Sequence, residues 1–125
     1  MPYKKGWSAI IPAAGRGSRL GTTDAKIFFR VRGKMLIDYL LDLLTPRVDE
    51  LIVIVAPEFK ERMEAHLLRD GRMAYACAVQ PSPQGMADAV RYAHEDVRYE
   101  QSLVLWGDQI TLRPETLERA QTLHL

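Results

Sequence analysis

The stretch WSAIIPAAGRGSRLG, residues 7–21, decides the fold of this chain. It begins with a short apolar run, typical of a strand that is buried on both faces, and ends in a loop that contains three glycines. Similar apolar runs occupy residues 50–56, 73–79 and 102–106. With residues 7–13 as the first run, the sequence predicts four buried strands.

Segments with a helical period separate these strands. The four helices that this period predicts cover residues 36–44, residues 58–71, residues 85 to about 95, and the residues from 114 onward. Strand and helix thus alternate four times along the chain. This order predicts an α/β fold of the three-layer, Rossmann-like type, a mostly parallel sheet with helices on both faces.

Length and charge limit the classes of function. The chain has 125 residues, so residues 1–125 are expected to form a single domain. Seventeen basic and sixteen acidic residues give a formal net charge of +1, which predicts neither a nucleic-acid partner nor a membrane partner. No apolar run is long enough for a transmembrane or signal segment, so a cytoplasmic location is expected. The single cysteine, Cys77, is interpreted as a core residue.

The first loop has the composition of a phosphate cradle. The backbone of Ala13, Ala14, Gly15 and Gly17 can approach an anion closely, and Arg19 and Lys26 supply the positive charge that phosphates require. A P-loop is excluded, because position 20 is Leu where that motif, counted from Gly15, needs its second glycine. A dinucleotide fingerprint fits poorly, because its third glycine falls at position 21 and a loop follows.

Two further loops carry polar residues just after a predicted strand. Gln80 can both donate and accept hydrogen bonds, as reading the edge of a pyrimidine requires, and Gly85 would let the backbone lie against the base or ribose. Asp108 follows Gly107 beyond the fourth strand, and such a carboxylate is a natural ligand for Mg²⁺. Asp88, on the third predicted helix, is interpreted as a surface group.

The run of residues 12–20, with Ala25-Lys26 and residues 33–36 after it, resembles the signature of the sugar-1-phosphate nucleotidyltransferases, a signature that the MobA-like molybdopterin nucleotidyltransferases share. It is similar to the N-terminal half of the N-acetylglucosamine-1-phosphate uridylyltransferase domain. The resemblance implies the nucleotide-diphospho-sugar transferase fold, with the Ala-Ala-Gly turn holding the nucleotide and Arg19 and Lys26 holding its phosphates. Ala25 departs from the proline usual in the family, which is expected to loosen the loop.

Together these features predict a Mg²⁺-dependent nucleotidyltransferase of the pyrophosphorylase type. It would transfer a nucleoside monophosphate from a nucleoside triphosphate, UTP or CTP favoured, to a sugar 1-phosphate or a similar phosphate acceptor. A nucleotide-binding or regulatory module without turnover is the alternative, and a dinucleotide-dependent oxidoreductase ranks last. The resemblance covers only about the first half of the family's catalytic domain, so the chain is expected to be truncated at its C-terminal side. The uncovered sheet edge that results would favour self-association.

Overall fold

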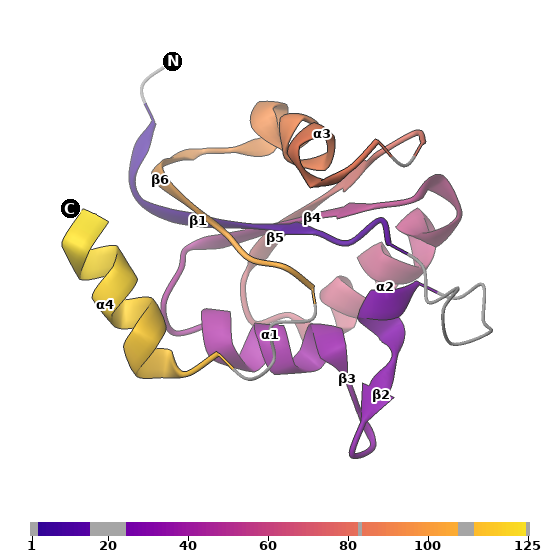
Figure 1. Cartoon of the computed structure of the whole chain (residues 1–125), viewed down its shortest axis with the longest axis horizontal. Coiled ribbons are helices and arrows are strands. Elements are labelled where there is room, and N and C mark those ends of the chain that lie inside the picture. Colours follow the sequence, from indigo (N-terminus) through magenta and orange to yellow (C-terminus); the bar gives the residue numbers. More distant parts are fainter. Residues whose placement is uncertain (1–2, 16–24, 83, 108–111, 125) are drawn as a thin grey trace.

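The computed structural model describes residues 3–15, 25–82, 84–107 and 112–124. Its strands and helices alternate as the sequence predicts (Figure 1). The main strands are β1 (Lys4–Pro12), β4 (Glu50–Val55), β5 (Ala74–Val79) and β6 (Tyr99–Val104). The α-helices are α1 (Leu36–Leu44), α2 (Lys60–Asp70), α3 (Met86–Arg91) and α4 (Pro114–His124). Short elements lie between them: the 3₁₀ helices η2 (Lys26–Phe28), η3 (Pro57–Phe59) and η4 (His94–Asp96), and the strands β2 (Arg30–Val31) and β3 (Lys34–Met35).

The four main strands form one parallel sheet in the order β5-β4-β1-β6. Every residue of β4 is buried, as expected for a central strand that is covered on both faces. β1 lies beside it, with Ser8 opposite Glu50 and Pro12 opposite Ile54. The predicted Rossmann-like parallel sheet is therefore confirmed.

Alternate residues of β4 pack into two separate cores. Leu51, Val53 and Val55 belong to the larger cluster, which also contains buried residues of α1, α2 and α4. Ile52 and Ile54 belong to the smaller cluster, which contains residues of α3 and of the turn after it. The helix α3 therefore covers the sheet face opposite to α1 and α2, and the domain has three layers (Figure 1).

Helix ends follow the predicted signals with one correction. α1 ends at Leu44, two residues before Pro46, and α2 ends at Asp70 and is capped by Gly71, which has a φ of 65°. The third helix, predicted to reach about residue 95, ends at Arg91. There the hydrogen bonds tighten to the 3₁₀ spacing, since the Tyr92 N–H donates to the Ala89 carbonyl and the Ala93 N–H to the Val90 carbonyl.

A buried polar cluster at the amino ends of the strands gives no signal in the sequence. Ser8 is fully buried and Glu50 is 4% exposed. The Ser8 hydroxyl donates to Glu50 Oε2 over 2.6 Å, and the Arg98 backbone N–H donates to the same oxygen over 2.8 Å. Glu50 thus ties β1, β4 and the chain entering β6 together.

The strand β6 lies at one edge of the sheet and, in the described part of the chain, pairs with β1 alone. Val104, the last residue of this strand, is 46% exposed, and Trp106, just beyond it, is 47% exposed. The predicted uncovered edge is present, and self-association through it stays a prediction. Within the described ranges, no helix is long and apolar enough to cross a bilayer.

Candidate functional site

The loops expected to carry function leave the sheet at the carboxyl ends of its strands. Three backbone hydrogen bonds fix their starting points: the Ala13 N–H donates to the Ile54 carbonyl, Gln80 to Val55, and Leu105 to Ile10. These bonds link neighbouring strands, so the segments that follow β1, β5 and β6 begin along one edge of the sheet. Ligands of open parallel sheets bind at this end of the sheet, where the carboxyl ends of the strands lie.

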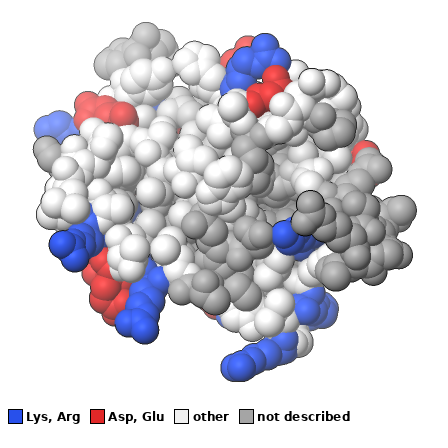
Figure 2. Space-filling view, viewed as in Figure 1, with Lys and Arg blue, Asp and Glu red and all other residues white. Residues whose placement is uncertain are grey.

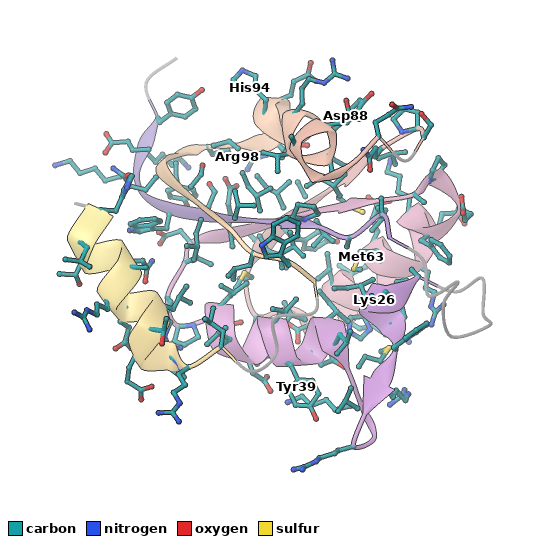
Figure 3. All side chains as sticks on the ribbon, in the orientation of Figure 1. Lys26, Tyr39, Met63, Asp88, His94 and Arg98 are labelled. Atoms are coloured by element: carbon teal, nitrogen blue, oxygen red, sulfur yellow. The ribbon has the colours of Figure 1, made fainter. Side chains whose placement is uncertain are left out.

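Lys26 lies at the base of the glycine-rich loop. Its backbone N–H donates to the Gly15 carbonyl over 3.2 Å, so the two described ends of the first loop meet. Its neighbours Ala25, Ile27 and Phe28 are buried, whereas Lys26 itself is exposed (Figure 3). The loop is therefore anchored by apolar residues on either side of a lysine whose side chain reaches the surface. Gly17 and Arg19, predicted members of this cradle, lie outside the described residues.

The substitution at Ala25 does not require a different backbone. Ala25 has φ −67° and ψ 133°, values that a proline also adopts. The residue is fully buried, and its carbonyl accepts the Phe28 N–H over 3.1 Å. The backbone at Ala25 therefore leads into Lys26 in a conformation that the family's usual proline would also allow.

The segment after Lys26 packs through Phe28 against Phe59. Phe28 is 4% exposed, and its ring centroid lies 6.1 Å from that of Phe59. The Arg62 guanidinium of α2 stacks over the Phe28 ring at 3.9 Å from its centroid. These contacts connect η2 to η3 and to α2.

A hairpin missed by the sequence analysis follows this segment. β2 and β3 form an antiparallel pair, and Arg32 and Gly33 between them have φ values of 53° and 78°. Two residues with positive φ are typical of the tight type I′ hairpin turn. The usual sequence signal for this turn is Asn-Gly or Asp-Gly, whereas this chain has Arg32-Gly33, so the sequence did not indicate it. Arg30 of β2 and Arg32 of the turn are exposed.

The first helix anchors this hairpin. The Tyr39 hydroxyl donates to the Val31 carbonyl over 2.7 Å, and Lys34 forms an ion pair with Asp42. Asp42 also accepts from Arg72 over 2.8 Å. The hydrogen bonds from Lys34 and Arg72 hold the pKa of the Asp42 carboxyl below its ordinary value of 3.8. Hydrogen bonds and ion pairs thus connect the hairpin, α1 and the chain just after α2.

The predicted base-reading residue is buried at the end of β5. Gln80 is 3% exposed, and its Nε2 donates to the Gly85 carbonyl over 3.2 Å and to Asp88 Oδ2 over 2.9 Å. Gly85 has a φ of 91°, a conformation that residues with a Cβ rarely adopt, and this explains the glycine at that position. The structure brings Gln80 and Gly85 together, and their contact with a base stays a prediction.

Asp88 is a residue whose contacts with this loop the sequence analysis missed. Its carboxylate is 19% exposed, and besides Gln80 it accepts a hydrogen bond from Arg91 over 2.8 Å. It is therefore part of the loop's internal network, not the solvated group that was expected. The spacing of eight residues across a loop gives no periodic signal that could have indicated this contact.

The fourth loop begins beside the first. A Cβ built on Gly107 would lie 3.0 Å from Ile27 Cδ1 and 3.9 Å from the Pro12 carbonyl oxygen, so only a residue without a side chain fits there easily. Asp108, the predicted metal ligand that follows Gly107, lies outside the described residues. Among the residues described, no three His, Cys, Asp or Glu side chains form a group that could hold a metal ion. Mg²⁺ bound together with phosphate oxygens needs only one or two protein carboxylates, so the prediction for Asp108 does not require such a group.

Charge and cysteine chemistry agree with the sequence analysis. Figure 2 shows blue and red side chains scattered over the visible face, without a large patch of either sign among the residues it colours. Cys77 is half-buried in β5 against the larger core, and burial raises the pKa of its thiol to about 12. The thiol is therefore a packing group, as interpreted.

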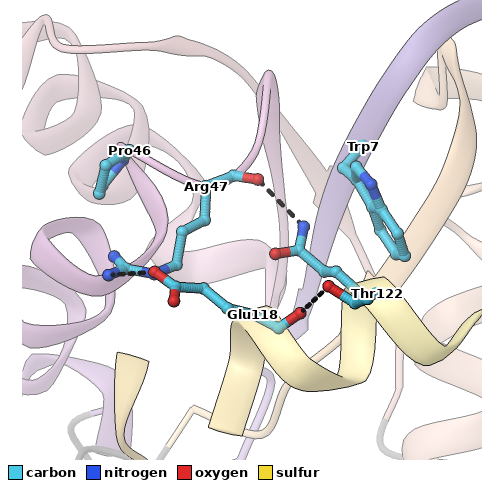
Figure 4. A pocket seen from close by; sticks show the side chains of 6 residues that line it. Trp7, Pro46, Arg47, Glu118 and Thr122 are labelled. Carbon is cyan, nitrogen blue, oxygen red and sulfur yellow. Dashed lines mark hydrogen bonds and ion pairs between the residues drawn. The ribbon is translucent and has the colours of Figure 1, made fainter. Parts of the chain in front are cut away.

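A hollow of about 380 Å³ lies between β1 and α4, where Trp7 and Arg47 face the last helix (Figure 4). Arg47 pairs with Glu118 at 3.2 Å, and the Gln121 side chain donates to the Arg47 carbonyl over 3.0 Å. Trp7 precedes the carboxyl half of β1, and none of the predicted site residues that the structure describes lines this hollow. Its polar contacts dock α4 on the domain.

The profile of the family described as MobA-like NTP transferase domain matches residues 9–123. The chain belongs to the MobA-like NTP transferase family. The match spans the glycine-rich loop, Lys26, Gln80 and Gly85, and it confirms the resemblance that the first loop indicates.

Individual members of the MobA-like NTP transferase family show the same relation. The chain is 30% identical to the bifunctional protein GlmU of Desulfitobacterium hafniense over 127 residues, and 31% identical to that of Rubrobacter xylanophilus over 111 residues. These alignments cover 100% and 87% of this chain but only 26% and 23% of the two relatives. The chain therefore spans about a quarter of the length of these curated relatives.

A solved structure shares the MobA-like fold. The inositol-1-phosphate CTP transferase from T. maritima superposes with a TM-score of 0.81 at 22% identity, over 95% of this chain and 50% of that chain. The superposition confirms the fold and places this domain on half of the neighbour. The general class, a nucleotidyltransferase-like domain, rests on the family and on the GlmU relatives.

Proposed function

We propose that this domain transfers a nucleoside monophosphate from a nucleoside triphosphate, UTP or CTP favoured, to a sugar 1-phosphate or a similar phosphate acceptor, with release of pyrophosphate and with Mg²⁺. The hydrogen bond between the Lys26 N–H and the Gly15 carbonyl carries this proposal. This bond holds a lysine where the glycine-rich loop closes, at the carboxyl ends of the strands, where parallel sheets bind ligands. A surface turn with solvated basic residues would need no such closure.

The roles of the residues follow from their chemistry. Ala13, Ala14, Gly15 and Gly17 would surround the phosphates with backbone N–H groups. Lys26, together with Arg19, would neutralise the charge that grows on the phosphate oxygens in the transition state. Gln80 and Gly85 would hold the base at the end of β5.

The reaction needs no general base from the protein. The second pKa of a phosphate monoester is about 6, so the acceptor is mostly a dianion at neutral pH. One of its oxygens would attack the α-phosphorus and form a new P–O bond, while the bond from that phosphorus to the bridging oxygen breaks. The bridging oxygen keeps the electron pair and leaves as part of pyrophosphate. The protein contributes position and opposing charge, as in other phosphoryl-type displacements.

Asp108 is the residue proposed to hold Mg²⁺. The ion, when bound, supplies positive charge to the phosphate oxygens of the nucleotide. The position of Gly107 against Ile27 and near the Pro12 carbonyl supports this assignment, because it starts the fourth loop beside the first.

Nucleotide titrations test the binding half of the proposal. UTP, CTP, GTP and NADH are titrated against the chain with and without Mg²⁺, using intrinsic tryptophan fluorescence. We expect a pyrimidine triphosphate to bind most tightly, with Mg²⁺ strengthening the binding, and Lys26→Ala to weaken it. Lys60→Ala is the matched control, because Lys60 is an exposed lysine of α2 that faces Glu64. Tight binding of NADH alone would favour the oxidoreductase, and equal loss in both variants would remove Lys26 from the site.

A further inference from the structure

The strand β5 forms the second open edge of the sheet. In the described part of the chain it pairs with β4 alone, and the Gln80 N–H that follows it donates to the Val55 carbonyl of that neighbour. In a parallel strand the N–H and C=O groups of one residue point to the same side, and successive residues alternate between the two sides. The backbone groups of Ala74, Ala76 and Ala78 therefore point toward β4, as the Gln80 N–H does.

The backbone groups of Tyr75, Cys77 and Val79 point the other way, toward the open edge. No strand among the described residues meets them there. β5 contains no charged residue and no proline, and its register with β4 is regular throughout. Charged side chains, prolines and bulges are the features by which proteins keep edge strands from pairing with other chains. β5 has none of these protective features.

The other open edge, β6, does have a protective feature. The Leu105 N–H donates to the Ile10 carbonyl of β1, so the alternate residues of β6, Glu100 among them, point their backbone groups to the open edge. Glu100 is charged and exposed. A charged residue at this position opposes pairing with a further strand. Of the two open edges, β5 is therefore the one that accepts another strand more readily.

We propose that two copies of this chain pair through β5, with the two strands antiparallel about Cys77, so that the sheet continues from one copy into the other. In this register Tyr75 of each copy lies opposite Val79 of the second copy, and Cys77 lies opposite its own counterpart. All outward backbone groups of these three residues then have partners across the interface. Tyr75 and Val79 also form an aromatic and β-branched pair of the kind that stabilises antiparallel strands. The inference concerns assembly and does not depend on nucleotide transfer.

The charges of α2 fit this symmetry. α2 packs on β5, and its Lys60 and Glu64 lie 4.0 Å apart as an ion pair. Burial is the main cause that raises the pKa of the Cys77 thiol, Glu64 adds to the rise and Lys60 opposes it, so both charges lie near the middle of β5. A two-fold axis at Cys77, perpendicular to the sheet, places the two α2 helices side by side and antiparallel. Lys60 of each copy then faces Glu64 of the other, and opposite charges meet twice.

The spacing of the two helices is also suitable. Each α2 lies over the last two strands of its own sheet, and two strand spacings amount to about 10 Å. Helices pack against each other at about 8–10 Å. Leu68 continues the stripe of Lys60 and Glu64 by one turn and is 70% exposed, so the contact also removes an apolar side chain from water.

Sedimentation velocity at increasing concentration tests this assembly in the intact chain. We expect the mass to rise from that of one chain to that of two. Glu64→Lys places like charges opposite each other at two symmetric positions and should weaken the dimer about tenfold. The double variant Lys60→Glu/Glu64→Lys exchanges the two charges and restores both opposite pairs. Its dissociation constant should return to within about twofold of the wild-type value.

The matched control is Glu100→Lys, which makes the same change of charge on the competing edge strand β6. It should leave the dissociation constant unchanged. If Glu100→Lys weakens association and Glu64→Lys does not, the proposal is wrong. A wild-type chain that stays monomeric up to about 1 mM, or that forms larger species in place of a dimer, overturns it as well.

Amide hydrogen exchange followed by ¹⁵N–¹H NMR tests the register directly. The three outward N–H groups of β5 should exchange at least about tenfold more slowly in the dimer than at concentrations where the chain is monomeric. The N–H groups of Ala76 and Ala78, which face β4, should be protected at both concentrations. Protection that appears with concentration at the outward N–H groups of β6, and not at those of β5, would overturn the proposal.

Discussion

Removal of the Glu50 side chain should destabilise the domain strongly, although this residue lies at the amino ends of the strands, away from the candidate site. Its Oε2 atom accepts from the Ser8 hydroxyl at 2.6 Å and from the Arg98 N–H at 2.8 Å. In Glu50→Ala both donors lose their acceptor. Ser8 is fully buried, so water cannot replace the carboxylate at its hydroxyl.

The size of the effect follows from these contacts. A buried donor left without a partner costs about 1–3 kcal/mol. The Ser8 hydroxyl should carry the larger part of this cost, and the Arg98 N–H, on an exposed residue, the smaller part. We expect Glu50→Ala to lower the free energy of unfolding by about 3 kcal/mol, a large fraction of the about 5–15 kcal/mol of a typical domain.

Urea unfolding at equilibrium measures this change, with the slope m as a check that the unfolded state is the same. Glu100→Ala, which truncates an exposed glutamate of β6, is the matched control and should change stability by less than about 0.5 kcal/mol. In the double variant with Ser8→Ala, the loss should be smaller than the sum of the two single losses, because the buried hydroxyl is gone. A loss below about 1 kcal/mol for Glu50→Ala at unchanged m would refute the reasoning.

Three further predictions follow from the same structure. Gly6→Ala should lower the free energy of unfolding in urea by about 2–4 kcal/mol, because φ is 135° and the new Cβ would overlap Asp49 Oδ2. Gly71→Ala should lower it by about 1 kcal/mol, because φ is 65° and the nearest atom to the new Cβ lies 3.7 Å away. The reverse order of the two losses would contradict this geometry. The Cys77 thiol, with its pKa raised to about 12, should react with iodoacetamide at pH 9 on the order of a thousandfold more slowly in the folded chain than in urea, and equal rates would show that burial does not protect it. Asp108→Asn should abolish Mg²⁺-dependent turnover, and an unaltered Mg²⁺ titration of the variant would remove this residue from the metal site.

The central strands could be predicted because burial on both faces leaves them continuously apolar. β4 is the clearest case, with the sequence Glu-Leu-Ile-Val-Ile-Val. At the sheet edge the signal weakens: β6 covers Tyr99–Val104 where residues 102–106 were predicted, because the polar Glu100 and Gln101 precede the apolar run. β1 likewise begins at Lys4, before the apolar stretch, and its register with β6 shifts between Lys4 and Trp7.

The candidate site could be predicted in its residue types but not in its contacts. Glycines and a lysine after a buried strand indicate a phosphate loop, and the bond from Lys26 to Gly15 joins its two described ends. The pairing of Gln80 with Asp88 depends on a loop backbone that turns at Gly85 with φ 91°, and no periodicity encodes such a turn. The roles of Arg19, Gly17 and Asp108 remain predictions from the sequence and the family resemblance.

Release of pyrophosphate tests the central claim most directly. The chain is incubated with Mg²⁺ and either CTP or UTP, with and without hexose or hexosamine 1-phosphates, and pyrophosphate is measured over time. We predict release that requires a phosphate acceptor, that falls by orders of magnitude in Lys26→Ala, and that persists in Lys60→Ala. Nucleotide binding without pyrophosphate release for any acceptor would contradict nucleotidyl transfer by this domain and would identify it as a binding module.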